Sequence, residues 1–240
     1  MLGAITFLTV FGPRQTSQQP GSSGFAWFWL VGASIGSAVA GVWWSLSMVA
    51  SPPVAALVAV LVDMSVTGML HLDGLADSAD GLLAPMKRHR RLEVMRKPDV
   101  GAFGVCALVM GLLGRWVALS GGGFNPLVIV GVWSMSRSLA ATVPGFVRYA
   151  RSDGGLASAF LPGATRWLVI GLIPGMIMTV VAEPLAGGLA TGALMVGAML
   201  VVALAHRQIG GFTGDVLGAV IVVAETVALI VAASITGTGS

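Results

Sequence analysis

The chain has 240 residues, of which 56% are hydrophobic and only 10% are charged, and its mean hydropathy is +0.91. A soluble domain carries roughly a quarter charged residues, so this composition excludes an ordinary water-soluble surface. The single cysteine, Cys106, excludes a disulfide framework and a cysteine-based metal site.

Residues 1–10 are apolar, but a helix needs roughly 20 residues to cross a bilayer, so we expect this segment to lie against the membrane. Seven later stretches are long and apolar enough to span it. Because backbone groups have no water partners in hydrocarbon, each is predicted to be a helix. The stretches run approximately over residues 25–50, 52–71, 101–120, 124–143, 166–186, 187–206 and 216–236. The predicted fold class is therefore all-α, a single polytopic membrane domain over residues 1–240 with a hydrophilic segment at about 72–100.

The basic residues of the connections all fall on one side of these seven spans. They are Arg14, Lys87, Arg88, Arg90, Arg91, Arg96, Lys97, Arg148, Arg151, Arg166 and Arg207. The positive-inside rule places this side in the cytoplasm, which predicts a multi-pass protein of the cell (inner) membrane with the N-terminus inside and the C-terminus outside. Basic residues beside a membrane meet anionic lipid or a phosphorylated substrate, so the pI near 9.8 needs no nucleic acid to explain it.

An acidic segment follows the second span directly, with the sequence HLDGLADSADG over residues 71–81. Asp73, Asp77 and Asp80 are spaced i, i+4, i+7, which places them within a wedge of roughly 60° on one helix face. Carboxylates so close repel one another unless a cation lies among them, and Mg²⁺ commonly bridges carboxylates to substrate phosphates. We therefore expect a magnesium site at the cytoplasmic end of the bundle, with a solvated acidic face as the alternative.

Five further polar residues invite a chemical interpretation. His71 is a candidate general base, phosphate donor or structural hydrogen-bond partner. Asp63 lies within the second span, where a carboxylate is costly, and either supports the site or ties helices together. Arg115 is expected to pair with a carboxylate deep in the bundle or to snorkel, whereas Arg137, near the cytoplasmic end of its span, is predicted to clamp phosphate. Asp215, at the entrance to the last span, is either a metal ligand or an N-cap.

The segment over residues 71–81 closely resembles the signature of the cobalamin synthase (adenosylcobinamide-GDP ribazoletransferase) family. Four further stretches agree with that family in order and spacing: Leu92–Arg96 with Gly101 and Gly104, Ser136–Arg137, Tyr149–Arg151 with Gly155–Leu156, and Gly210–Asp215 with Leu217–Gly218 and Glu225. The chain departs from the family at Lys97–Asp99, where an Asp-Ser-Arg-like triplet is usual, and at Val222, where an acidic or polar residue is common.

The resemblance implies a membrane-bound, Mg²⁺-dependent enzyme. It would transfer the adenosylcobinamide-phosphate group of adenosylcobinamide-GDP to α-ribazole or its 5′-phosphate, and GMP would leave. We expect four aspartates to hold the metal: Asp73, Asp77, Asp80 and Asp215. Asp80 or His71 is the expected catalytic base. The expected substrate-binding residues are Arg96, Arg137, Lys87 and Arg88.

Two other functions stay open at this point. A CDP-alcohol phosphotransferase of phospholipid synthesis shares the pattern over residues 77–84, but Pro85 occupies that family's arginine position and its later paired aspartates are missing. A membrane transporter would line the membrane midplane with charge, whereas the aspartates are predicted at the cytoplasmic rim. The sequence leaves the oligomeric state open.

Overall fold

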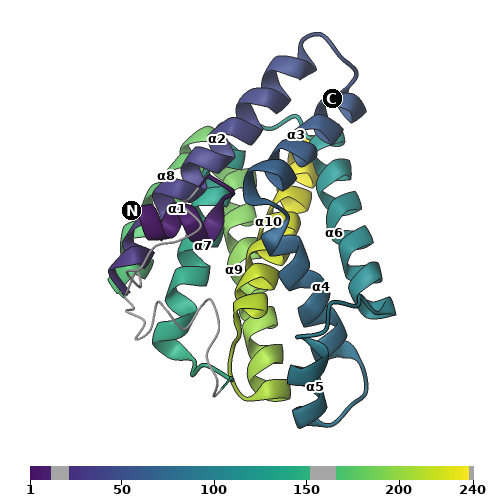
Figure 1. The fold of residues 1–240 in the computed structure, drawn as a ribbon. Helices are drawn as coiled ribbons and strands as arrows, with labels where there is room; N and C mark the ends of the chain where they lie inside the picture. The colour runs from purple at the N-terminus through teal and green to yellow at the C-terminus, as the bar shows by residue number, and fades with distance from the viewer. Residues whose placement is uncertain (12–21, 152–165, 238–240) are drawn as a thin grey trace.

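A computed structural model describes residues 1–11, 22–151 and 166–237. This part of the chain is helical, apart from one isolated bridge between Tyr149 and Phe212, and the predicted all-α class is confirmed (Figure 1). The helices in chain order are α1 (Leu2–Leu8), η1 (Ser22–Trp27), α2 (Phe28–Ser47), α3 (Pro52–Thr67), α4 (Leu70–Leu83), α5 (Arg88–Val94), α6 (Ala102–Gly121), α7 (Leu127–Phe146), α8 (Arg166–Ala182), α9 (Pro184–Ile209) and α10 (Gly214–Thr236).

Five helices in the described ranges are long and apolar enough to cross a membrane: Gly24–Ser47, α6, α7, α9 and α10. Helices α3 and α4 together make a sixth candidate, and α8 contributes a shorter apolar helix over Ile170–Ala182. Each of the seven predicted spans thus contains one helix, which roughly agrees with the expected number. Along its apolar stretch α7 is 83% buried and forms the centre of the bundle, whereas α6 is 22% buried and presents most of its surface outward.

The predicted second span ends early because the chain turns sharply between α3 and α4. Gly68 (φ 59°) and Met69 (φ 60°) both adopt left-handed backbone conformations, and the two helices meet at an angle of 89°. Glycine tolerates this conformation without strain, whereas methionine does not. The backbone N–H of Val10 donates to the carbonyl oxygen of Val66 at 3.0 Å, so the segment after α1 packs against the turn. The turn gives the acidic segment a helix of its own.

Four buried charged residues tie α3, α6, α7 and α10 together inside the bundle. Arg115 donates to Asp63 at 2.7 Å and to Glu225 at 2.5 Å. Arg137 forms an ion pair with Glu225, and its NH2 group lies 3.8 Å from Asp63. Trp133 Nε1 donates to Asp63 at 2.8 Å. Two carboxylates therefore offset two guanidinium groups, as the low dielectric of a membrane interior requires. The prediction that Arg115 pairs deep in the bundle is confirmed, and Asp63 is a tie between helices.

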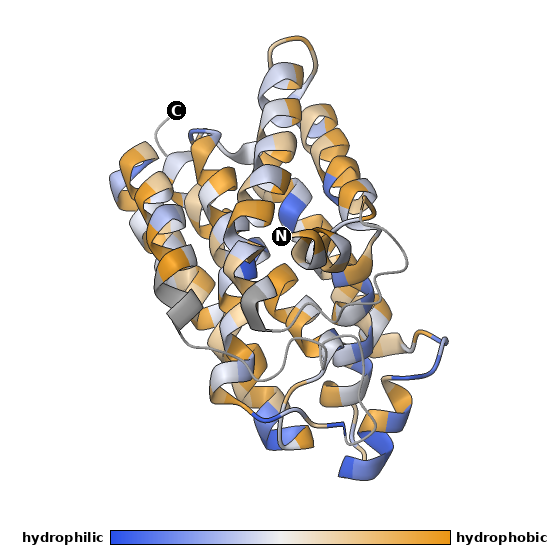
Figure 2. Ribbon diagram, turned by 60° about the vertical axis from the view of Figure 1, so that its left-hand side comes forward, coloured by the Kyte–Doolittle hydropathy of each residue, from blue (hydrophilic) through white to orange (hydrophobic). Residues whose placement is uncertain are grey.

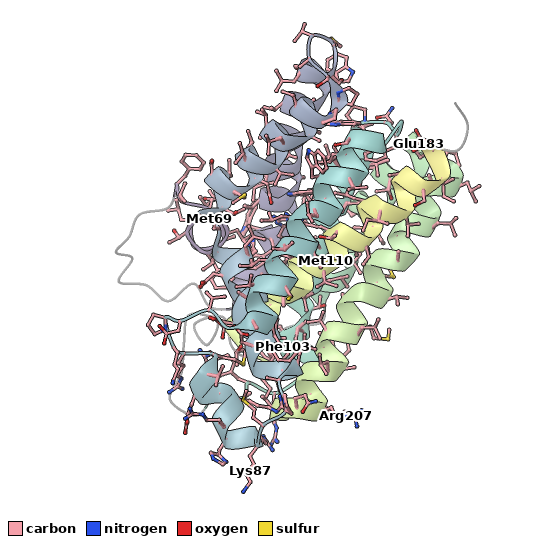
Figure 3. All side chains as sticks on the ribbon, turned by 90° about the vertical axis from the view of Figure 1, so that its right-hand side faces the viewer. Met69, Lys87, Phe103, Met110, Glu183 and Arg207 are labelled. Atoms are coloured by element: carbon pink, nitrogen blue, oxygen red, sulfur yellow. The ribbon has the colours of Figure 1, made fainter. Side chains whose placement is uncertain are left out.

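The charged surface lies at one end of the bundle. Figure 2 shows apolar residues along the long helices and hydrophilic residues gathered around α5. Lys87 and Arg207 lie at this end, and Glu183 lies at the opposite end (Figure 3). We name the end that carries α5, Lys87 and Arg207 the basic end.

The buried network makes a prediction about stability. Replacing Arg115 with leucine leaves Asp63 and Glu225 short of a cation inside the bundle, and we expect a loss of about 3–5 kcal/mol in the free energy of unfolding, the usual cost of breaking a buried ion pair. Unfolding in detergent measures this loss. Arg90→Leu, which removes an exposed pair with Glu93, is the control and should change stability little. An Arg115→Leu protein as stable as the wild type would contradict the assigned role.

Candidate active site

Close packing between α4 and α10 brings Asp215 to the acidic face of α4. A Cβ atom on Gly74 would lie 2.8 Å from the carbonyl oxygen of Asp215, and one on Gly218 would lie 3.1 Å from the carbonyl oxygen of His71. Because both positions lack a side chain, the two helices approach one another closely. The first turn of α10 therefore lies beside the start of α4.

Backbone hydrogen bonds bring Arg151 next to Asp215. The N–H of Ala150 donates to the carbonyl of Phe212 at 2.8 Å, and the N–H of Phe212 donates to the carbonyl of Arg148 at 3.0 Å. The chain after α7 is thereby held against the turn before α10. Arg151 then donates to Oδ2 of Asp215 at 2.8 Å.

Asp215 is held in a defined orientation and is not the N-cap of α10. Thr213 is the N-cap, since its hydroxyl oxygen accepts from the N–H of Val216 at 3.3 Å. The Thr213 hydroxyl also donates to Oδ2 of Asp215 at 3.1 Å. Both side-chain partners of Asp215 thus contact Oδ2. Its Oδ1 has no such partner among the described residues, so this oxygen is available to a ligand.

Asp73 and Asp77 are the unpaired acidic groups of the site. Asp73 is exposed and Asp77 is half-buried, and neither carboxylate has a hydrogen bond or ion pair in the part of the chain that the structure describes. Asp77 is repelled by the charges of Asp215, Asp73 and Asp80, that of Asp215 being the strongest. A cation near Asp77 would offset this repulsion.

A cavity of about 110 Å³ opens beside these carboxylates. Asp73, Arg151 and Asp215 line it, and His71 lies in its wall with only 5% of its surface exposed. The structure thus brings together three of the predicted residues, Asp73, Asp215 and His71, around one cavity. Arg151 joins them without having been predicted as a site residue, although its Tyr149–Arg151 stretch was part of the family resemblance.

Asp80 has a different structural role from the one expected. Its two carboxylate oxygens accept hydrogen bonds from the N–H groups of Gly101 (2.7 Å) and Gly104 (2.9 Å). The side chain is 7% exposed and satisfies free donors at the N-terminus of α6, where a negative charge is favoured. Its catalytic and metal-binding roles stay untested predictions.

Arg137 belongs to the buried ion-pair network. Its side chain is fully buried in the network with Glu225 and Asp63, and it does not line the cavity that carries Asp73 and Asp215. The predicted phosphate clamp at this residue stays an untested prediction.

The remaining predicted substrate-binding residues lie on the basic end. Lys87, Arg88 and Arg96 are exposed, so all three present charge to solvent. Arg91 differs, because its NH1 group donates to the carbonyl oxygens of Gly81, Leu82 and Ala84 at 2.7–3.0 Å. It caps the C-terminus of α4 and is 7% exposed, so it is not part of the exposed basic surface.

The carboxylates of this site suit magnesium if water and substrate phosphate complete its coordination. No group of three His, Cys, Asp or Glu side chains within the described ranges is arranged to hold an ion. Magnesium, however, is usually bound by one or two carboxylates together with waters and substrate phosphates. Asp77 and Oδ1 of Asp215 would supply two such carboxylates. The site therefore suits a metal that arrives with a phosphorylated substrate.

Comparison with known proteins identifies relatives over most of the chain. A family model described as cobalamin-5-phosphate synthase matches residues 1–233. The adenosylcobinamide-GDP ribazoletransferase of Chlorobium phaeovibrioides is 37% identical over 94% of this chain and 93% of its own length. That of Escherichia coli is 34% identical over 96% of both chains, and that of Bradyrhizobium diazoefficiens is 37% identical over 77% of this chain and 72% of its own. No solved structure matches the chain significantly.

The hydrogen bonds of Asp80 predict that this residue stabilises the start of α6, whatever its role in catalysis. In Asp80→Asn the amide nitrogen cannot accept a hydrogen bond, so one N–H at the start of α6 loses its partner. We expect a loss of about 1–3 kcal/mol in the free energy of unfolding without any metal present. Chemical unfolding in detergent measures this loss, with the exposed Asp99→Asn as the control. Unchanged stability would show that Asp80 does not anchor α6.

Proposed function

The chain belongs to the cobalamin-5-phosphate synthase family, and we propose that the reaction of this family takes place at the acidic cleft, which is the cavity lined by Asp73, Asp215 and Arg151. Asp77 follows Asp73 by one helical turn on α4. The chain is an adenosylcobinamide-GDP ribazoletransferase. It transfers the adenosylcobinamide-phosphate group of adenosylcobinamide-GDP to α-ribazole or α-ribazole 5′-phosphate, and GMP is released. The match over nearly the whole chain carries this conclusion and favours it over a CDP-alcohol phosphotransferase or a transporter.

Asp77 and Oδ1 of Asp215 would hold a magnesium ion on the pyrophosphate of adenosylcobinamide-GDP. When bound, the ion would offset negative charge on the pyrophosphate and on the leaving GMP. Arg151 and Thr213 fix the orientation of the Asp215 carboxylate, as groups around a metal ligand commonly do. The unpaired carboxylate of Asp77 and its repulsion by the charge of Asp215 support this assignment.

The chain's cationic groups would bind the phosphates. Arg151 lines the cavity, and its Nε is buried without a hydrogen-bond partner in the described part of the chain, so it retains a donor for a phosphate oxygen. Lys87, Arg88 and Arg96 lie exposed on the basic end and would attract the anionic substrates by long-range electrostatics.

Asp73 is the group we assign to accept the proton of the attacking hydroxyl. The hydroxyl oxygen forms a bond to the phosphorus of the cobinamide phosphate, the bond to the GMP oxygen breaks, and the hydroxyl proton must leave. Asp73 is exposed, unpaired and lines the cavity. Asp80 has both oxygens occupied, and His71 lies deeper in the cavity wall. The carboxylate at the open end is therefore the better candidate.

The apolar helices suggest a multi-pass membrane protein, and we propose that its basic end faces the cytoplasm. The positive-inside rule supports this orientation, since Lys87 and Arg207 lie at that end and Glu183 lies at the other (Figure 3). The cleft would then open toward soluble nucleotide substrates. The inner membrane is the corresponding location in a bacterial cell.

Removing the charge of Asp77 tests the assignment. We expect Asp77→Asn to lower turnover by about 100- to 1,000-fold, the range typical of losing one electrostatic contact to a transition state. The measurement is conversion of radiolabelled adenosylcobinamide-GDP and α-ribazole by membranes containing the protein, over a range of Mg²⁺ concentrations. Glu93→Gln, on the exposed surface of the adjacent α5, is the matched control and should remain active.

Two outcomes would contradict the proposal. A folded Asp77→Asn protein with wild-type turnover would remove Asp77 from the site. Full activity of the wild type after removal of divalent cations would exclude the magnesium role.

A further inference from the structure

A second cavity, of about 560 Å³, lies at the end of the bundle that carries Glu183, opposite the basic end (Figure 3). It shares no lining residue with the cavity of the proposed active site. The ends of α2, α3, α6, α7 and α10 surround it. Binding sites for small molecules typically have volumes of about 300–1,000 Å³, so this cavity is large enough for a small ligand or a lipid headgroup.

Glu183 gives this cavity a negative charge. It is the only ionisable side chain among the described residues that line the cavity. Its Oε1 accepts a hydrogen bond from the N–H of Asn125 at 3.1 Å, whereas its Oε2 has no partner and no cation pairs with the carboxylate in the described part of the chain. An unpaired carboxylate in a concave site attracts a positively charged ligand.

Most hydrogen-bond donors around the cavity are already used or missing. Ser47, Ser120 and Thr236 line it, and each hydroxyl donates to a carbonyl oxygen of its own helix at 2.7–3.0 Å. The starts of α3 and α7 contribute Pro52 and Pro126, and proline has no backbone N–H. The protein therefore offers a ligand more acceptors than donors here.

The end of α6 supplies further acceptors. The last four carbonyl groups of a helix lack a partner within it and carry partial negative charge. The carbonyl oxygen of Leu119 accepts from Nε1 of Trp43 at 3.0 Å. Gly122, the C-cap, is extended and provides no capping N–H within the described chain. A ligand with several N–H donors and a positive charge complements these carbonyl groups and the Glu183 carboxylate.

Aromatic rings form part of the same wall. Trp43, Trp44 and Phe124 line the cavity, and the rings of Trp43 and Phe124 stack with their centroids 5.3 Å apart. Tryptophan is common at membrane interfaces, so the rings alone do not indicate a ligand. Together with an unpaired carboxylate they do, because the face of an aromatic ring attracts an organic cation.

We propose that this cavity binds the ammonium group of a small amine, which is either the ethanolamine headgroup of a phospholipid or a free amine in solution. The Glu183 carboxylate offsets the positive charge, the carbonyl groups at the end of α6 accept the N–H donors, and the rings cover the attached carbons. The site is separate from the acidic cleft, and the inference does not depend on the proposed function.

Thermal unfolding with ethanolamine as the probe tests the proposal. In the purified wild-type protein in detergent, we expect saturating ethanolamine at constant pH to raise Tm by about 2–4 °C. Ethylene glycol, which is uncharged and of similar size, should have no effect. In Glu183→Gln the oxygen that accepts from Asn125 is kept and only the charge is lost, so the shift should disappear. Glu93→Gln, exposed on α5 at the basic end, is the matched control and should keep the shift.

Nanodiscs identify the source of the ammonium group. The Tm values of the wild type and of Glu183→Gln are compared in phosphatidylglycerol alone and after addition of phosphatidylethanolamine. A rise in Tm confined to the wild type shows that the lipid headgroup occupies the site, whereas a rise with free ethanolamine alone shows a soluble amine. Equal shifts in the wild type and Glu183→Gln, an equal effect of ethylene glycol, or no shift with either amine would overturn the proposal.

Discussion

The cost of an unpaired charge in a low-dielectric interior divides the charged residues of this protein into two groups. Inside the bundle, Asp63, Arg115, Arg137 and Glu225 offset one another and connect four helices. On α4, Asp73 and Asp77 lack partners in the described structure. Charges that are paired hold the bundle together, and those that are unpaired are available to a cation and a phosphorylated substrate.

The fold determines where the unpaired carboxylates of Asp73 and Asp77 lie. The sharp turn at Gly68 and Met69 starts α4 in a new direction, and Arg91 satisfies the carbonyl groups at its other end. The close approach at Gly74 then sets Asp215 against α4. The cleft therefore depends on backbone contacts at the ends of helices. This is where loops and helix termini can present polar groups without burying them in lipid.

The positions of the spans were predictable because apolar length can be counted directly in the sequence, and the pairing of Arg115 followed from its depth. The roles of Asp80 and Arg137 were not predictable in this way. Helical spacing places Asp80 on the same face as Asp77, but it does not reveal that the N-terminus of α6 covers that one turn. Likewise, nothing local to Arg137 indicates Glu225 as its partner, because the two lie on separate helices. Side-chain partners distant in sequence are determined by tertiary packing.

The central claim is that a divalent cation binds between α4 and the first turn of α10. Iron-directed cleavage tests it most directly. Fe²⁺ replaces Mg²⁺ in the protein with pyrophosphate bound, and ascorbate with peroxide then generates radicals that cut the backbone near the ion. The account predicts cuts close to residues 73–77 and 215 that excess Mg²⁺ suppresses. Cuts near Glu183 at the opposite end, or no Mg²⁺-sensitive cuts, would contradict it.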